Sequence, residues 1–136
     1  MTPTLTDILL GQAAAIAAPQ PPEAGGDYMA SRLGMVAMIA TLAAQEAERG
    51  PAVRVWENAA IQALLTGAGG AAVDAPDRED FTWSGLDRKN AVLRRALTAL
   101  HESAEARGDQ ALQAEILGLY VAMAEARRLD LPSALD

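Results

Sequence analysis

Apolar residues recur three and four positions apart over most of this chain, which is the period of a helix with one buried side. The alternation of apolar and polar residues that marks a half-buried strand is nearly absent. Prolines and glycines interrupt the helical pattern at residues 18–26, 49–51, 66–80 and 108. The pattern therefore predicts an all-α protein, an antiparallel bundle of four to five helices with a proline-tethered N-terminal helical arm.

The first interruption separates a short N-terminal segment from the rest of the chain. Residues 1–18 carry an apolar helical pattern and are the predicted arm. Residues 19–26, "PQPPEAGG", cannot continue a helix and are the predicted tether. Residues 27–136 are then the helical bundle domain. At 136 residues in total, the chain is expected to form a single domain overall.

Two helices are expected on either side of Pro51. The first starts near Asp27, ends near Arg49, and is apolar on two adjoining faces, which is typical of a helix at the centre of a bundle. The second runs from Pro51 to about Leu65. Because a proline lacks a backbone donor and is disruptive inside a helix, the pattern predicts a kink or a break at this residue.

Two further helices follow the polar loop at residues 66–80. In "SGLD", Ser84 and Asp87 form a variant of the capping box and predict that a helix starts there. Gly108 is expected to end that helix, and Asp109 is expected to cap the last one. The last helix has an apolar stripe, and its members are Leu112, Ile116, Leu119, Tyr120 and Met123.

Two near-copies, "ENAAIQALL" and "KNAVLRRAL", place Asn58 and Asn90 at the same point of a heptad pattern. Counting in sevens from Asn90 gives an apolar seam, formed by Trp83, Leu86, Leu93, Leu97, Leu100 and Ala104. Asp74, near the centre of the loop, is equidistant in sequence from the two asparagines. In an antiparallel hairpin they would therefore lie level. We expect them to form a register-setting pair, within one chain or across a dimer. The alternatives are that both touch water at the edge of the seam, or that the similarity is chance.

Composition and charge argue against several classes of protein. The formal net charge of −7 disfavours nucleic-acid binding, which needs a positive field. The absence of cysteine excludes disulfides and thiolate metal sites. No apolar run reaches about 18 residues, so no membrane span is expected. The first residues include Asp7 but no lysine or arginine, unlike a secretory signal, and we expect a cytoplasmic protein.

No motif in the chain indicates catalysis, a cofactor or a metal. His101 is the only histidine, and with Glu105 one turn away it offers too few ligands for a metal site. The serines lie in no G-x-S-x-G motif, and "TGAGGA" follows no predicted strand and precedes no lysine. The sequence therefore predicts no catalytic residue, no cofactor and a non-enzymatic role.

Two groups of residues are candidates for binding. Arg88 and Arg95 are seven residues apart on one helix face, which suits an acidic protein partner or a phosphate, although an exposed flank is the simpler interpretation. The second group could line an adaptable apolar pocket, although such residues are more often ordinary core. Its members are Met35, Met38, Tyr120 and Met123.

These observations favour a small helical protein that acts through protein–protein association. A homodimer is the expected assembly, because an amphipathic arm on a flexible tether can pack on a second subunit. The alanine-rich helix from Asp27 and the N-terminal arm are the expected contact surfaces. The alternative function is the binding of a small apolar ligand in the pocket lined by methionine and tyrosine.

Overall fold

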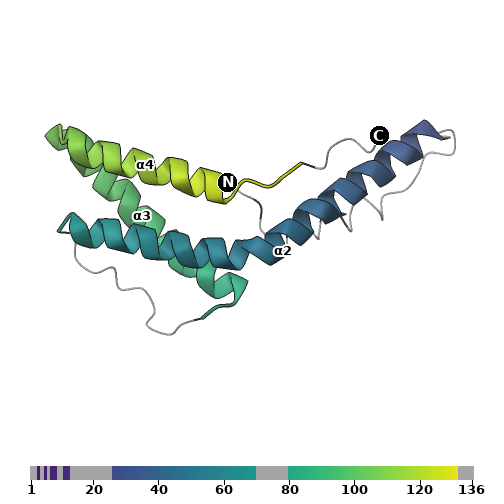
Figure 1. Cartoon of the computed structure of the whole chain (residues 1–136), viewed down its shortest axis with the longest axis horizontal. Coiled ribbons are helices and arrows are strands. Elements are labelled where there is room, and N and C mark those ends of the chain that lie inside the picture. Colours follow the sequence, from purple (N-terminus) through teal and green to yellow (C-terminus); the bar gives the residue numbers. More distant parts are fainter. Residues whose placement is uncertain are drawn as a thin grey trace. The chain divides into compact units, whose positions relative to one another are not determined.

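The computed structural model describes residues 26–69 and 80–131, together with residues 3, 5, 7, 8, 11 and 12. Its long helices are α2 (Asp27–Gly67), α3 (Trp83–Arg107) and α4 (Gln110–Ala126) (Figure 1). The described residues contain no strand, so the predicted all-α class is confirmed. The described part of the chain has three such helices rather than four or five.

Helix α2 passes through Pro51 without a break, and the two helices expected on either side of this proline are one element of 41 residues. The predicted break is wrong. Pro51 has no amide hydrogen to donate to the carbonyl of Ala47, one turn earlier. An interior proline disfavours a helix by about 3 kcal/mol, and the helical residues on both sides of Pro51 outweigh that cost here.

The chain divides into two compact units near this proline. Unit 1 contains Met1–Arg49 and Leu129–Asp136, and unit 2 contains Gly50–Arg128. The buried core shared by the three helices lies in unit 2, and the bundle domain expected from Asp27 onward stays a prediction. The chemical reason is that the apolar residues of α2 that pack on α3 and α4 follow Pro51.

The predicted arm and tether lie mostly outside the described residues. Six residues of the arm are described: Pro3 is not helical, and the five helical ones are Leu5, Asp7, Ile8, Gly11 and Gln12. Of the tether, only Gly26 is described, and it is a turn residue with a positive φ of 56°. The loop expected at 66–80 begins later than predicted, because α2 continues to Gly67.

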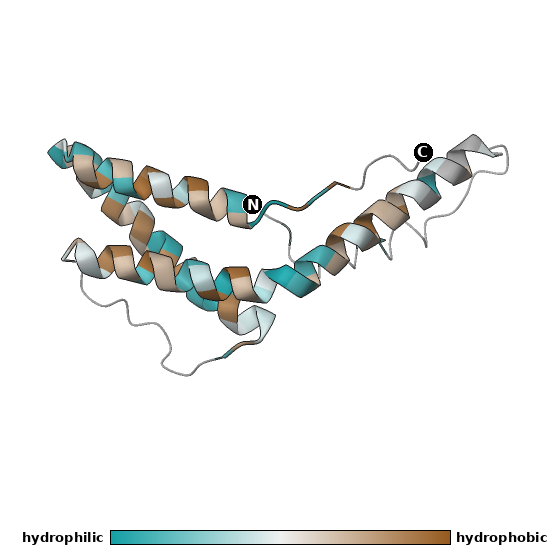
Figure 2. Ribbon diagram, in the orientation of Figure 1, coloured by the Kyte–Doolittle hydropathy of each residue, from teal (hydrophilic) through white to brown (hydrophobic). Residues whose placement is uncertain are grey.

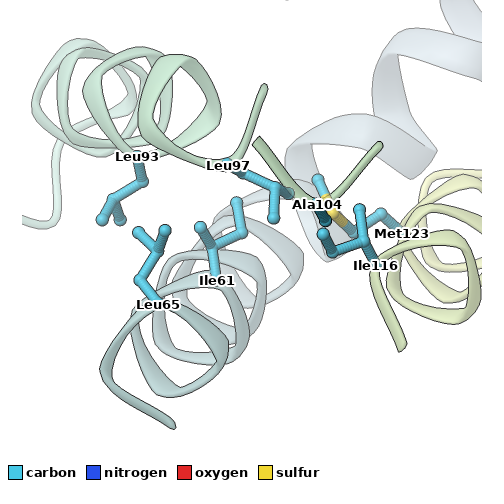
Figure 3. Packing of buried hydrophobic residues seen from close by; sticks show 7 residues of the cluster. All are labelled: Ile61, Leu65, Leu93, Leu97, Ala104, Ile116 and Met123. Atoms are coloured by element: carbon cyan, nitrogen blue, oxygen red, sulfur yellow. The ribbon is translucent and has the colours of Figure 1, made fainter. Parts of the chain in front are cut away.

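The core of unit 2 lies between the second part of α2 and the hairpin of α3 and α4 (Figure 3). The buried cluster draws members from all three helices, and they are Ile61, Leu65, Leu93, Leu97, Ala104, Ile116 and Met123. Most apolar residues predicted to be buried on α3, and all of those predicted on α4, belong to this cluster or pack against it. The prediction that apolar residues at helical spacing on α3 and α4 form the core is therefore confirmed.

The N-cap of α3 lies two residues before the predicted cap, Ser84. Thr82 is the N-cap, and its hydroxyl oxygen accepts a hydrogen bond from the amide of Gly85 at 3.1 Å. Thr82 is held in turn by Asp80, whose Oδ1 accepts from the amide and from the hydroxyl of Thr82. The capping role assigned to Ser84 and Asp87 is therefore wrong, because Thr82 already satisfies the first turn of the helix.

A turn of two residues joins α3 to α4, as the sequence predicted. Gly108 ends α3 in the left-handed conformation with a φ of 66°, which glycine adopts without strain. Asp109 caps α4 by accepting a hydrogen bond from the amide of Leu112 at 3.1 Å. The turn brings α4 back along α3 as its antiparallel neighbour (Figure 1).

Unit 1 contains the first part of α2 and a short segment that follows α4. Gln45 exchanges two hydrogen bonds of 2.8 Å with the backbone of Asp130, and Arg49 pairs with the carboxylate of Asp130 at 3.5 Å. Nearby, Ile39, Leu42 and Leu129 line a small apolar cavity of about 200 Å³, together with Pro3 and Ile8 of the arm. Two residues of the arm, Pro3 and Ile8, thus share this cavity with α2 of their own chain.

The first part of α2 is less buried than a central helix. Met29, Met35 and Met38 are 39%, 53% and 38% exposed in this chain. The predicted central position is therefore not found within unit 1, although apolar residues do predominate here (Figure 2). Among the described side chains of this part of α2, Ala43 and Glu46 are the buried ones.

Candidate functional site

Asn58 on α2 and Asn90 on α3 meet inside unit 2. The Nδ2 amide of Asn90 donates to Oδ1 of Asn58 at 3.0 Å, and the two residues are 4% and 5% exposed. The Nδ2 amide of Asn58 donates to the carbonyl of Leu86 at 3.3 Å. The structure thus brings the two asparagines together within one chain, at the level that the loop symmetry predicts.

A fully buried carboxylate lies beside the two asparagines. Glu57 on α2 accepts a hydrogen bond from Nδ2 of Asn90 at 3.0 Å. Both of its oxygens accept from the guanidinium group of Arg127, the residue that follows α4. Arg127 also donates to Oδ1 of Asn90 at 3.2 Å. These contacts join α2, α3 and the end of α4 at a single point.

A second buried cation completes this group. Arg54 is 6% exposed, and its Nη1 lies 3.8 Å from Oε2 of Glu57. Its Nε donates to Oδ1 of Asp87 on α3 at 2.6 Å, and its guanidinium lies 5.9 Å from the ring centroid of Trp83. We call the whole group the buried polar cluster, and its members are Arg54, Glu57, Asn58, Asp87, Asn90 and Arg127.

The buried polar cluster is balanced in charge. Two arginines face two carboxylates, and no buried side-chain nitrogen or oxygen among the described residues lacks a hydrogen-bond partner. Buried ions are tolerated only when they are paired in this way, and a half-satisfied group would be costly. The arrangement of the cluster therefore suits the fixing of helix positions.

Breaking the asparagine contact should reveal a coupling between the two residues. We expect the effects of Asn58→Ala and Asn90→Ala on the free energy of unfolding to be non-additive by about 0.5–3 kcal/mol, because the side chains share a hydrogen bond. Urea unfolding, monitored by circular dichroism, measures the free energy of unfolding of each single variant and of the double variant. As a control, Asn58→Ala combined with Gln113→Ala should be additive, since Gln113 bonds only to Ala104. Additivity for the asparagine pair would contradict the register-setting role.

A cavity of about 620 Å³ lies in unit 2 beside the buried polar cluster, between α2 and the start of α3. Asn58 belongs to both the cluster and the cavity lining. Val55, Phe81 and Leu86 contribute apolar wall, and Lys89 contributes a positive charge. The cavity is therefore mainly apolar, with a few polar groups.

Asp80 and Arg88 also line the cavity, where they neutralise one another. Their closest charged atoms are 3.0 Å apart. The hydrogen bonds from Thr82 and, to a smaller extent, the charge of Arg88 lower the pKa of Asp80 below its usual value. Asp80 thus stays ionised at neutral pH.

The predicted basic face of α3 is only partly available. Arg88 and Arg95 are both exposed, but Arg88 is paired with Asp80. Arg95 forms no ion pair with a described residue. The two arginines therefore do not present two free charges, and an acidic partner at this face stays a prediction.

The four residues of the predicted methionine and tyrosine pocket have different surroundings. Met35 and Met38 are exposed in unit 1. Met123 belongs to the core of unit 2, and Tyr120 packs against that core with its ring 5.7 Å from the ring of His101. None of the four lines either cavity described above. For Met123 and Tyr120 the simpler interpretation as core residues is confirmed.

The sequence pattern did not identify four members of the buried polar cluster, which are Arg54, Glu57, Asp87 and Arg127. A signal for two of them was present on α2. The buried stripe of Ile61 and Leu65, followed backward at helical spacing, reaches Asn58, Glu57 and Arg54. Polar residues on the buried side of a helix indicate a buried network. Arg127 gave no such signal, because it lies beyond the last apolar turn of α4.

In residues 26–69 and 80–131 and the described arm positions, no three His, Cys, Asp or Glu side chains gather closely enough to hold a metal ion. None of the helices described combines the length and apolarity needed to cross a membrane. No family model, curated protein or solved structure matches the chain.

Proposed function

We propose that this chain is a small, non-enzymatic helical protein that acts through self-association, and that two copies meet along the first part of α2. The observation that carries the proposal is the exposure of Met29, Met35 and Met38 on this part of the helix. Exposed apolar surface of this kind is typical of an interaction site, because covering it with a partner removes it from water.

The chemistry of this surface favours a second copy as the partner. Between residues 28 and 44 the only charged side chain is Arg32. Small exposed residues also recur on this part of α2, on a different side of the helix from Met29 and Met35; at spacings of three and four, they are Gly34, Ala37, Thr41 and Ala44. A stripe of small residues allows two helices to approach closely, and a stripe on identical chains is self-complementary about a two-fold axis.

The N-terminal arm offers a second element for the dimer. Pro3 and Ile8 lie against Ile39, Leu42 and Leu129 in unit 1 of one chain. We propose that in the dimer the arm occupies the same apolar site on the partner, as an exchanged element. The expected compartment for this assembly remains the cytoplasm.

A charged residue on the stripe should separate the dimer. Ala37 is exposed in the single chain, so Ala37→Glu should leave the helix folded while it places two like charges in the interface. We expect the dimer to be weakened by at least about a hundredfold. Light scattering over a dilution series measures the association. Ala63→Glu, at an exposed position of α2 in unit 2, is the control and should not affect association.

The same measurement distinguishes the roles of helix and arm. A chain that begins at Gly25 lacks the arm but keeps α2. If it dimerises as the full chain does, the exchange of arms is ruled out while the contact along α2 stands. If the full chain is monomeric at all concentrations, the proposed self-association is wrong.

A further inference from the structure

The cavity of about 620 Å³ in unit 2 has the dimensions of a small-molecule site. Such sites commonly measure about 300–1,000 Å³, with mostly apolar walls and a few polar groups. Val55 and Phe81 are 42% and 61% exposed, and both line this cavity. An apolar ligand surface would cover them.

The inner lining of the cavity contains an amide with spare hydrogen-bonding capacity. Asn58 is almost fully buried, and its Nδ2 carries two hydrogens. One is donated to the carbonyl of Leu86, and no described residue accepts the other. The oxygen of the same amide already accepts from Asn90. The second N–H of the Asn58 amide is therefore available as a donor, and a ligand atom that accepts a hydrogen bond would satisfy it.

The charge beside the cavity points to an anionic acceptor. Arg88 is neutralised by Asp80, but Lys89 forms no ion pair with a described residue and lines the cavity. Against the overall charge of −7, this lysine is a local site of positive charge. An oxygen anion can be paired with an ammonium group and also accept the amide hydrogen of Asn58.

We propose that this cavity binds a small amphipathic anion, with a compact apolar body against Val55, Phe81 and Leu86 and an oxygen anion toward Lys89 and Asn58. A carboxylate and a phosphate ester share this chemistry. The site lies in unit 2, on residues that take no part in the proposed contact along the first part of α2. The inference therefore does not depend on self-association.

Titration of the labelled full chain with naphthoate, followed by nitrogen–proton NMR, tests the proposal. Naphthoate and naphthyl phosphate should give saturable shifts in the amides of residues 55–62 and 81–89, and the tighter of the two identifies the preferred anion. Inorganic phosphate alone and naphthylmethylamine should bind at least about tenfold more weakly, because one lacks the apolar body and the other carries the wrong charge.

Two pairs of variants localise the binding. Lys89→Gln should weaken naphthoate about fivefold to tenfold, whereas Arg95→Gln removes the same charge from the same helix outside the cavity and should leave binding unchanged. Ala59→Leu places volume at an exposed position of the lining and should block the site. Ala63→Leu, also exposed on α2 but outside the lining, is its control.

Each possible result of these titrations either supports or overturns the proposed site. Saturable anion binding that Lys89→Gln and Ala59→Leu weaken, and that both controls retain, supports the site. Absence of saturable binding by naphthoate and by naphthyl phosphate at millimolar concentration overturns it. Equal affinity for the amine, or an equal loss in Lys89→Gln and Arg95→Gln, also overturns it, because the binding would then be nonspecific.

Discussion

Replacing Arg127 with methionine is expected to lower the free energy of unfolding of unit 2 by about 3–5 kcal/mol, which is the typical cost of removing one partner from a buried ion pair. The reason is the complete burial of Glu57, whose two oxygens both bond to this arginine. Without Arg127, the carboxylate keeps only the amide of Asn90 and the more distant Arg54. Urea unfolding of the full chain at neutral pH measures the loss.

The neighbouring arginine provides a matched control. Arg128, just beyond the end of α4, is mostly exposed, and its only ion pair among the described residues is with Glu125, three residues earlier, at 3.5 Å. Exposed pairs of this kind contribute little, so Arg128→Met should cost less than about 0.5 kcal/mol. Adding Glu57→Gln to Arg127→Met should recover part of the stability, because the unpaired buried charge is then gone. If the two arginine variants are equally stable, the buried polar cluster does not hold unit 2 together.

The second large effect is expected in the apolar core. Leu97 on α3 is completely buried, and it belongs to the cluster that all three helices share. Leu97→Ala should cost about 2–5 kcal/mol, the sum of the lost transfer free energy and the cavity left behind. The midpoint and slope of urea unfolding report the change, and an unchanged slope shows that the fold is kept.

Leu117 on α4 is the control for this substitution. It is 52% exposed, so Leu117→Ala removes the same atoms without opening a cavity. We expect it to cost less than about 1 kcal/mol. A similar loss in Leu97→Ala and Leu117→Ala would mean that burial in this arrangement of helices does not govern stability, which contradicts the described core.

Periodicity was sufficient to find the core of unit 2. Leu93, Leu97 and Ile116 were expected on buried sides because burial on one side of a helix follows its 3.6-residue turn. Gly108 and Asp109 were found from local chemistry, since a left-handed cap favours glycine and a free first turn favours an acceptor. These features depend only on residues close together in the sequence.

Features that depend on distant residues were not predictable in the same way. Glu57 and Arg127 are 70 residues apart, and no local pattern connects them. Asn58 and Asn90 were placed level only because a symmetric hairpin relates distance in sequence to height along the helices. The continuity of α2 at Pro51 depends on a balance between one lost hydrogen bond and many retained ones, which the presence of a proline does not decide.

The buried polar cluster also has a consequence for the divergence of this sequence. A lone buried charge is costly, so substituting either Glu57 or Arg127 alone lowers the stability of the fold. Stability is kept only when both residues are substituted. Asn90 bonds to both, so it is restrained by the same requirement. Distant relatives should therefore keep Glu-Asn on one helix, Asn 32 positions after that asparagine, and Arg 37 positions further on, or lose the set as a whole. Alanine-rich helices resemble one another whether or not they are related. The spacing of these polar residues is therefore a better criterion for recognising relatives than the helical sequence around them.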